Sequence, residues 1–589
     1  MFNCLKNANI RNFLKYFFSC LILLVLLRFC ITEKIDLSKD IGYEVSFAAF
    51  LTLGGVLWNY SRRYSGLAAL FVIQYVLAAN VKRFFGMIIM DREIVHTAGL
   101  AVILFVSASM VLYVAKQVKL KICAVILKTA AYILYGLFLL PPLMYIGYAA
   151  VNEGLFSTDI ILTFFQTNLS EISAYLQYQS AVKWLLGSMS ILIVVVSQLY
   201  AFSRFEKPAF NKIMFGLTCL MCLYLTTQKV HKLNLSFAVN IIQSTEAVLQ
   251  SFEDFSQAKE KRLQNLEQLR ALGLETDAKG VYVLVIGESE TSDHMQVYGY
   301  QRPTTPWLTQ MAENENTFVF QHAYANHTHT IPTLTYALSA KNQYNRISLV
   351  DSYSIVEAAK AAGYKVYWLS NQIKFSVSET PVTVMASVAD VEKWINNNTG
   401  DKLITSYYDD HLVDELPDNH MEKALIILHL MGNHSTYQDR YPAKYSQFRG
   451  KERRIDAYDN SILYNDEVLR QIYEKVKKNP YFMAMVYFSD HGDDPDNGLG
   501  HECSRFSYRM ARIPFIVSVS ERFKEIHADQ FDLLKQQQNQ YWTNDLLYEF
   551  MTELMKINVN VNNKYNLLSS EYSLPQDEVL LLHGQRGLK

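Results

Sequence analysis

The chain of 589 residues has almost no net charge, because 55 lysines and arginines stand against 56 aspartates and glutamates. A near-neutral chain gives no electrostatic reason to bind nucleic acid, so we expect no nucleic-acid partner. The sequence also lacks internal repeats and low-complexity tracts. It is too long for one ordinary domain, and its composition divides it into two unlike parts.

Cysteine is scarce in the second part of the chain. Six of the seven cysteines lie before residue 223, and only Cys503 lies beyond it. An exported domain with one cysteine has no internal disulfide and must rely on the packing of its core. Cys219 and Cys222 lie inside an apolar run, so we interpret them as membrane packing rather than as a redox or zinc pair.

Charged side chains are scarce in residues 1–226, where we expect a transmembrane domain of five to seven helices. A bilayer core needs about 20 apolar residues as helix. Four segments meet this length, whereas 66–80 and 212–226 are short. Lysines and arginines at alternate connections place the N-terminus inside and the C-terminal part outside. The seven apolar segments are 12–31, 44–60, 66–80, 97–115, 122–149, 184–202 and 212–226, of which the first, fourth, fifth and sixth are the long ones.

Two further segments bear on how the chain meets the membrane. No small-residue cleavage site follows the first apolar segment, which we interpret as an uncleaved anchor. A connector is predicted over residues 227–276, and residues 245–272 within it carry Glu, Gln, Lys and Arg at helical spacing. Such a helix could lie on the membrane or on the soluble domain, or it could be a solvated linker.

Residues 277–589 are expected to form a catalytic domain of the α/β class. Short apolar runs alternate with helical stretches, which is typical of a mostly parallel sheet. In such sheets ligands bind beyond the carboxyl ends of the strands. The predicted strands are 281–286, 365–369, 424–430, 483–488 and 514–519, and the predicted helices are 331–340, 354–362, 455–477 and 543–556.

Polar side chains follow four of these predicted strands. A single histidine or aspartate at a strand end is usually a cap or a satisfied polar group, but several at one edge of a sheet indicate a site. A carboxylate pair with an imidazole suits zinc, which keeps one position open in catalytic sites. Glu288, Asp490 and His491 would supply three ligands. The residues at the four strand ends are Glu288; Asn371; His429 and His434; and Asp490, His491 and His501.

Thr330 is the candidate nucleophile. It precedes a helical run with Pro332 in the expected first turn. A helix N-terminus suits a phosphate and an alkoxide, and zinc would lower the hydroxyl pKa further. A threonine at this position is also a good N-cap, so a purely structural role stays open. Spacing does not exclude the neighbouring hydroxyls of Thr328, Thr333 and Thr335.

The motifs, taken in order, carry a resemblance to a known family. Together they resemble the membrane-bound phosphoethanolamine transferases of Gram-negative bacteria, in the sulfatase-like branch of the alkaline phosphatase superfamily. The resemblance covers roughly residues 160–560. The motifs are Gly287-Glu288, Tyr298–Pro306, the helix start at Thr330, His429–His434, Tyr458–Asp466, Ser489–Gly492 and Arg512–Val517.

The resemblance implies a zinc enzyme of the bacterial inner membrane, with several membrane passes and its catalytic domain in the periplasm. It implies that phosphoethanolamine moves from phosphatidylethanolamine, a membrane lipid, to Thr330 and then to lipopolysaccharide. Carried over by motif, the zinc ligands would be Glu288, Thr330, Asp490 and His491. His434 and His501 would contact the phosphoethanolamine or a second metal, and Asn371 and Lys374 would line the donor site.

Two departures from the family pattern concern the acceptor. Members that modify lipid A carry several disulfides and a Cys-Gly-Thr-x-Thr nucleophile segment, whereas this chain has Cys503 alone and reads His-Thr-His-Thr before Ile331. Both features are more similar to the branch that modifies core heptose. The apolar segments also exceed the five spans usual in the family.

Other functions are less well supported by the residues. A sulfatase would need Cys or Ser in a Cys/Ser-x-Pro-x-Arg motif, and the sequence Ile331-Pro332-Thr333 has no such residue before Pro332. A glycerophosphate or other phospho-group transferase of the same superfamily, acting on an envelope glycan, remains an alternative. A non-catalytic membrane protein with an inherited ectodomain is the third, although the intact set of candidate ligands speaks against it.

Overall fold

The structure is a computed structural model that divides into two compact units, Met1–Ala247 and Val248–Lys589. Each unit is described by itself. The predicted boundaries at residues 226 and 277 stay predictions. The residues described are 8–32, 37–57, 62–84, 91–152, 181–204, 215–221, the single positions 223, 239, 242, 243, 246 and 250, and then 259–274, 278–372, 380–396, 407–450 and 453–588.

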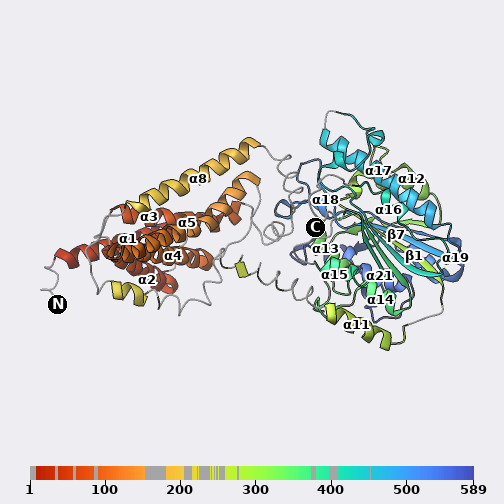
Figure 1. The fold of residues 1–589 in the computed structure, drawn as a ribbon, viewed down its shortest axis with the longest axis horizontal. Helices are drawn as coiled ribbons and strands as arrows, with labels where there is room; N and C mark the ends of the chain where they lie inside the picture. Colours follow the sequence, from red (N-terminus) through yellow and green to blue (C-terminus); the bar gives the residue numbers. More distant parts are fainter. Residues whose placement is uncertain are drawn as a thin grey trace. The chain divides into compact units, whose positions relative to one another are not determined.

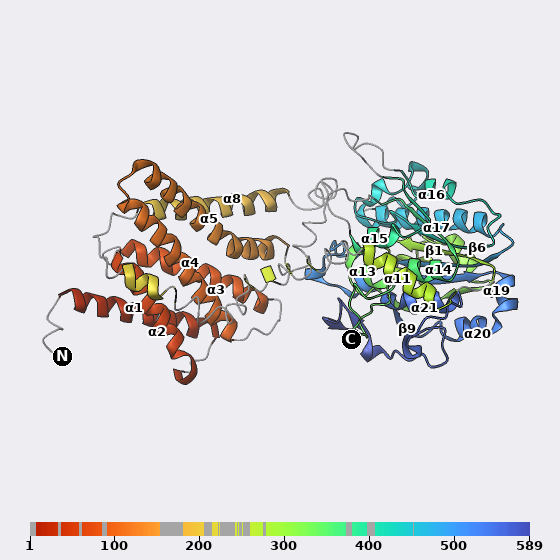
Figure 2. The ribbon, with the colours of Figure 1, turned by 60° about the horizontal axis from the view of Figure 1, so that its bottom comes forward.

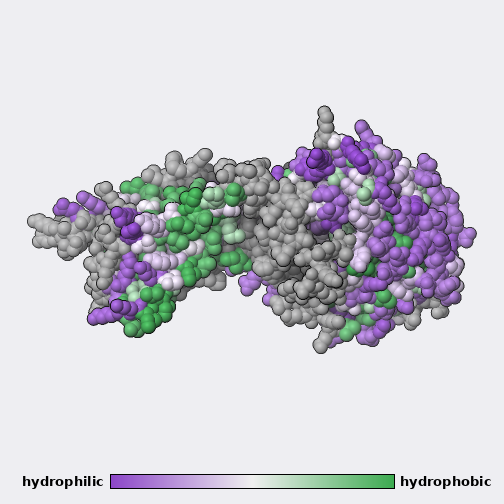
Figure 3. All heavy atoms as spheres, turned by 45° about the horizontal axis from the view of Figure 1, so that its top comes forward, coloured by the Kyte–Doolittle hydropathy of each residue, from purple (hydrophilic) through white to green (hydrophobic). Residues whose placement is uncertain are grey.

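Nearly all described residues of the first unit are helical, with a short break at 118–120 (Figure 1). Five predicted apolar segments each lie within one long helix, and the described part of the segment 44–60 lies in a sixth. Of the seventh, only 215–221 and 223 are described, and they are helical. On the described surface of this unit, hydrophobic side chains gather in patches (Figure 3). The helices are α1 (Ala8–Thr32), α2 (Leu37–Leu57), α3 (Arg62–Phe84), α4 (Asp91–Gln117), α5 (Lys121–Asn152) and α8 (Ala181–Ser203).

Helix length corrects one expectation for this unit. Among the described residues, three helices are long and apolar enough to cross a membrane: Arg63–Val81, Glu93–Gln117 and Lys121–Ala149. The segment at 66–80 is therefore not short, because its helix continues beyond the apolar run at both ends. In α1 and α8, expected to be long enough, the apolar stretches are the shorter Phe13–Val25 and Gly187–Ser203.

The second unit is built on a seven-stranded sheet in the order β2-β8-β7-β1-β6-β4-β5. The five strands from β7 to β5 are parallel, and β8 and β2 are antiparallel to their neighbours. The mostly parallel sheet predicted from the sequence is confirmed. The strands are β1 (Gly280–Gly287), β2 (Thr317–Val319), β4 (Lys365–Ser370), β5 (Val391–Trp394), β6 (Lys423–His429), β7 (Phe482–Ser489) and β8 (Phe515–Val519).

Six strands were not predicted, because each has only two to four residues and so shows no clear alternation. Besides β2 and β5, they form two small sheets. One pairs β3 (His322–Tyr324) with β9 (Tyr541–Thr543), and the other pairs β10 (Leu580–Leu581) with β11 (Arg586–Gly587).

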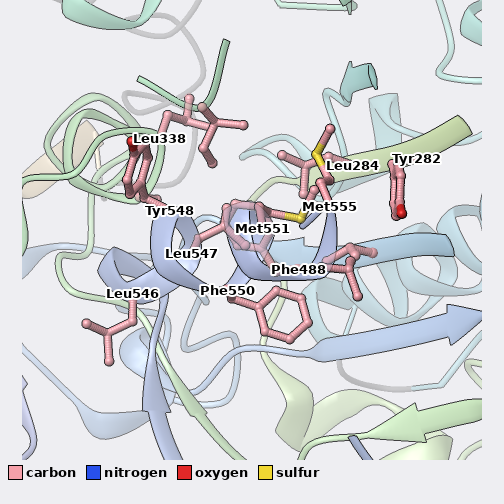
Figure 4. Close-up of a cluster of buried hydrophobic side chains, with 14 of the residues drawn as sticks. Tyr282, Leu284, Leu338, Phe488, Leu546, Leu547, Tyr548, Phe550, Met551 and Met555 are labelled. Atoms are coloured by element: carbon pink, nitrogen blue, oxygen red, sulfur yellow. The ribbon is translucent and has the colours of Figure 1, made fainter. Parts of the chain in front are cut away.

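Helices cover both faces of the large sheet (Figures 1 and 2). Successive β1 side chains alternate between two cores: Tyr282 and Leu284 lie in one, and Val281 and Val283 lie in the other. Figure 4 shows the first core, where Tyr282, Leu284 and Phe488 lie beside side chains of α21. The first face carries α13 (Thr330–Ala337), α14 (Ile355–Ala361), α15 (Pro381–Ala386) and α21 (Leu547–Leu554); the second carries α12 (Pro306–Met311), α16 (His411–Asp414) and α17 (Arg453–Val476).

Three further helices of this unit follow β7 or β8. They are α18 (Tyr508–Ala511), α19 (Glu521–Ile526) and α20 (Ala528–Gln536). Because β8 runs antiparallel to β7, α19 begins at the edge of the sheet opposite the carboxyl ends of the parallel strands. This places α19 and α20 away from the edge where the sequence predicts the site.

The predicted amphipathic segment contains α11 (Lys259–Ala271), which packs on the soluble domain. Leu266 and Leu269 are buried in the core beside α14. Arg262 is fully buried and donates to the Glu357 carboxylate at 3.1 Å and to the Ser352 carbonyl at 2.7 Å. A buried ion pair with additional hydrogen bonds fixes this helix, so the solvated-linker interpretation is wrong for α11.

Candidate active site

The strand register places the two predicted metal-binding segments side by side. Gly287, the last residue of β1, pairs with Ser489, the last residue of β7. Because the strands are parallel, the next residues, Glu288 and Asp490, leave the sheet at the same edge. Both carboxylates are buried, and so is the imidazole of His491.

Glu288, Asp490 and His491 form a group that could hold a metal ion. One ligand atom from each lies within 4.8 Å of the others. The Nε2 atom of His491 is 3.4 Å from Glu288 Oε1 and 3.4 Å from Asp490 Oδ2. Three buried side chains of metal-binding type thus follow two adjacent strand ends, and their role as zinc ligands stays a prediction.

Local backbone geometry orients these ligands. Ser289 has a left-handed φ of 57°, which is costly for a residue other than glycine. In that conformation its N–H donates to Asp490 Oδ1 at 3.0 Å and its hydroxyl donates to Glu288 Oε1 at 2.8 Å. His491 Nδ1 lies 3.1 Å from the Gly492 carbonyl, so the Nδ1–H donates there and Nε2 stays a free ligand.

Thr330 meets this group from the other side. It is the first residue of α13, and the N-cap is His329, without a side-chain capping bond. The Thr330 hydroxyl instead donates to Glu288 Oε2 at 3.1 Å and lies 3.4 Å from His491 Nε2. The alternative that Thr330 serves as an N-cap is therefore wrong in this structure.

The three competing threonines have other contacts. Thr333 donates to the His327 carbonyl at 3.0 Å, and Thr335 donates to the Ile331 carbonyl at 2.6 Å. Thr328 is buried, with its hydroxyl 3.4 Å from His329 Nδ1. Among the hydrogen bonds of the described residues, Thr330 alone of the four joins Glu288 and His491.

Electrostatics indicate that this group suits a cation. Burial, together with the neighbouring Glu288 carboxylate, raises the pKa of Asp490 to about 7. Burial also raises the pKa of Glu288, and it lowers that of His491, which favours the neutral imidazole a metal needs. Asp490 Oδ2 is buried without a hydrogen-bond partner among the described residues. Two carboxylates, an imidazole and a hydroxyl fit zinc.

His501 and Asp493 extend the site. His501 Nδ1 lies 2.8 Å from Asp493 Oδ1, and the His501 and His491 rings are 4.6 Å apart. Burial alone would lower the pKa of His501, but the Asp493 carboxylate opposes it and raises the pKa to about 9. His491, Asp493 and His501 also form a possible metal-binding group. Asp493 was not predicted, although it lies only three residues after Asp490.

The loop after β6 brings His434 to the same edge. Gly432 has a φ of +50°, and a Cβ there would lie 2.8 Å from the Glu288 nitrogen and 2.9 Å from its carbonyl oxygen. Glycine is thus required for this close approach. Asn433 donates its N–H to the Glu288 carbonyl at 2.9 Å. The His434 ring lies 6.4 Å from that of His501, and burial lowers the pKa of His434 to about 3.

The remaining predicted positions are Asn371, His429 and Lys374. The buried Asn371 amide donates to Asp409 Oδ1 at 2.8 Å and accepts from Asn396 at 2.7 Å, so it joins loops within the domain. A substrate contact by Asn371 stays a prediction. His429 packs against Trp368, with ring centroids 6.2 Å apart. Lys374 lies outside the described residues.

Comparison with known proteins first defines the class of the domain. Residues 281–557 match the family model described as Sulfatase. This range holds the whole sheet except the first residue of β1, together with the candidate metal ligands and Thr330. The second unit is therefore similar to a sulfatase domain over these residues.

Individual relatives then narrow the resemblance. Phosphoethanolamine transferase EptC of Escherichia coli (strain K12) is 28% identical over 415 residues, covering 64% of this chain and 71% of that protein. Phosphoethanolamine transferase EptA of Helicobacter pylori is 32% identical over 272 residues, covering 42% of this chain and 49% of that protein. The predicted resemblance to phosphoethanolamine transferases is confirmed.

A solved membrane protein shares the fold of the chain. The integral membrane protein lipooligosaccharide phosphoethanolamine transferase A from Neisseria meningitidis matches with a TM-score of 0.54 and 17% identity. The match covers 85% of this chain and 98% of that protein. Apolar helices followed by a sulfatase-like domain therefore make up the fold of this chain, as the sequence predicts.

Proposed function

We propose that this protein transfers phosphoethanolamine from phosphatidylethanolamine to lipopolysaccharide, with Thr330 as the nucleophile. One observation carries the proposal: the Thr330 hydroxyl lies between the Glu288 carboxylate and the His491 imidazole, where Asp490 has an unpartnered buried oxygen. Such a hydroxyl is placed to lose its proton and attack an electrophile. The named relatives support phosphoethanolamine as the group transferred.

Zinc fits the donor set formed by Glu288, Thr330, Asp490 and His491. When bound there, zinc would lower the pKa of the threonine hydroxyl and offset charge on a phosphate. The protein holds the ligands in place through Ser289 and the Gly492 carbonyl. Asp490 Oδ2 and His491 Nε2 are the atoms left available for the ion.

The reaction proceeds in two displacements. The Thr330 oxygen attacks the phosphorus of phosphatidylethanolamine, the bond from phosphorus to the diacylglycerol oxygen breaks, and diacylglycerol leaves with a proton. An acceptor hydroxyl then attacks the phosphorus carried by Thr330, the bond from phosphorus to the threonine oxygen breaks, and the proton lost by the acceptor restores the threonine hydroxyl. The His501 ring lies beside that of His491, and the His434 ring lies beside that of His501. We expect both histidines, with Asp493 as the partner of His501, to contact the phosphoethanolamine group.

The cellular setting follows from the same proposal. A lipid donor suits a chain whose first unit contains helices long and apolar enough to span a membrane. We place the chain in the bacterial inner membrane with several passes and its sulfatase domain in the periplasm. Core heptose is the proposed acceptor on lipopolysaccharide, with lipid A as the alternative.

Mass analysis of the full-length protein tests the chemistry. After incubation with phosphatidylethanolamine, a peptide containing Thr330 should carry phosphoethanolamine, and T330A should carry none. An adduct on Thr328 or Thr333 would refute the nucleophile assignment. Deleting the gene from its host should remove phosphoethanolamine from core fragments, and its loss from lipid A instead would overturn the acceptor.

A further inference from the structure

The last turn of the chain reaches back to the nucleophile segment. The hairpin of β10 and β11 turns through Leu582, His583 and Gly584, and the main chain and imidazole of His583 both contact Asn326. The His583 N–H donates to the Asn326 carbonyl at 3.1 Å, and His583 Nε2 lies 2.9 Å from Asn326 Oδ1. Because that oxygen can only accept, the Nε2–H is the donor.

The His583 ring also packs on the helix that begins with Thr330. It stacks on Tyr336 of α13, with ring centroids 4.0 Å apart and an interplanar angle of 9°. The His327 ring lies 5.0 Å from the His583 ring, centroid to centroid. His583 thus contacts both the segment before Thr330 and the helix after it.

Asn326 passes this restraint to the nucleophile segment and to the metal-binding group. Its amide donates to the Thr333 carbonyl at 3.1 Å, which closes the turn that contains Thr330. Its amide and its backbone N–H both donate to Asn544 Oδ1, at 2.7 and 2.9 Å. The Asn544 amide then donates to the Asp490 carbonyl at 2.7 Å. Asn326, Thr333, Asn544 and Asp490 are all buried.

The turn at His583 has a conformation that its surroundings must maintain. Leu582, His583 and Gly584 have φ values of 51°, 52° and 82°. Two successive left-handed residues other than glycine are energetically costly and persist only where contacts hold them. Gly584 donates to Gln343 Oε1 at 2.9 Å, and the Leu582 side chain is buried. Within this strained turn, His583 is the residue that bonds to the nucleophile segment, through Asn326.

We propose that His583 is a positioning residue, which fixes the Thr330 hydroxyl relative to Glu288 and His491 through Asn326 and the ring of Tyr336. The inference rests on the proposed function for its effect on turnover, but its effect on the order of residues 326–333 is independent of any activity.

Matched variants of the full-length protein test this role. H583L removes the donor and keeps an apolar side chain, whereas H583Q keeps a donor at the same number of bonds from Cα. H527L is the control, because His527 lies between α19 and α20, at the opposite edge of the sheet. The measurements are the rate of adduct formation on Thr330, the KM for phosphatidylethanolamine, the zinc content, and amide hydrogen exchange over residues 326–333.

H583L should form the adduct about tenfold to a hundredfold more slowly, because a misplaced nucleophile loses rate steeply. Its KM and zinc content should be those of the wild type, and exchange over 326–333 should be faster. H583Q should recover most of the rate and the protection, and H527L should match the wild type.

Three results would overturn the proposal: wild-type rate and exchange in H583L, loss of zinc together with the folded domain in H583L, or no recovery in H583Q. If the wild-type protein forms no adduct, the proposed function fails. The exchange measurement then still decides whether His583 orders the segment that contains Thr330.

Discussion

The candidate site has two sides that the chain builds in different ways. The strand side consists of Glu288, Asp490 and His491, and the nucleophile side consists of residues 326–330 with α13. On the strand side, the ligands directly follow two adjacent parallel strands whose last residues pair. On the nucleophile side, Asn326 is hydrogen-bonded to Asn544 and His583. These two residues lie 218 and 257 positions further along the chain.

This difference determines where the site can tolerate substitutions. The strand side inherits its geometry from the sheet, whose hydrogen bonds and two apolar cores hold β1 and β7 in register. The nucleophile side depends on a few side-chain hydrogen bonds between distant segments. Substitutions outside the ligands should therefore disturb Thr330 more readily than they disturb Glu288 or Asp490.

The largest expected effect is on the nucleophile itself. T330A should lower turnover on the order of 10⁴-fold or more, because the covalent step has no replacement hydroxyl. T330S keeps a hydroxyl at the same position and should retain part of the activity. Zinc content, measured on the same full-length samples, should fall less in T330A than in a ligand variant of the strand side. Equal turnover in T330A and the wild type would rule out the covalent mechanism.

The next effect is on the metal. D490A removes the carboxylate whose Oδ2 is unpartnered in the described structure, so the full-length variant should lose its bound zinc. Turnover should fall on the order of 10³-fold, since stabilisation of charge in the transition state is lost. D529A is the matched control, because Asp529 is an exposed carboxylate at the start of α20. Full zinc occupancy in D490A would refute the assignment of this ligand.

The strand side could be predicted from the sequence because its signals are local. An apolar run that stops at Asp490 and His491 marks both a buried strand and its end, and β1 repeats the pattern before Glu288. Five of the seven strands of the large sheet were found in this way. The directions of β8 and β2 were not, since a short apolar run carries no information about pairing.

The nucleophile side could be predicted only in part. Thr330 is the candidate because Pro332 marks a helix start, but spacing alone does not exclude the hydroxyls of Thr328, Thr333 and Thr335. The structure shows that those of Thr333 and Thr335 donate to carbonyls. The partners Asn544 and His583 carry no local signal, since asparagine and histidine at loop positions are common. Only tertiary structure brings them to Asn326.

A smaller effect concerns stability on the strand side. Two glycine variants separate the steric clash of a new methyl group from the strain of a positive φ. In G432A the new methyl group would meet the Glu288 backbone, and the left-handed φ adds strain, so unfolding should be easier by about 1–3 kcal/mol. G299A shares the positive φ, at +94°, but its methyl group would meet nothing within 4 Å. Chemical denaturation should therefore give G432A a lower free energy of unfolding than G299A. Equal stability of the two would show that the approach to Glu288 does not constrain residue 432.

The smallest effect measures the link between the two sides. Asn544 and His583 both bond to Asn326, and only Asn544 continues to the Asp490 carbonyl. In a double-mutant cycle, N544A and H583L should couple by about 0.5–1 kcal/mol in the free energy of unfolding, because they share this partner. The pair N544A and H527L has no common contact and should be additive. Additivity in the first pair as well would mean that Asn326 does not transmit the restraint, and that the two sides of the site are held independently.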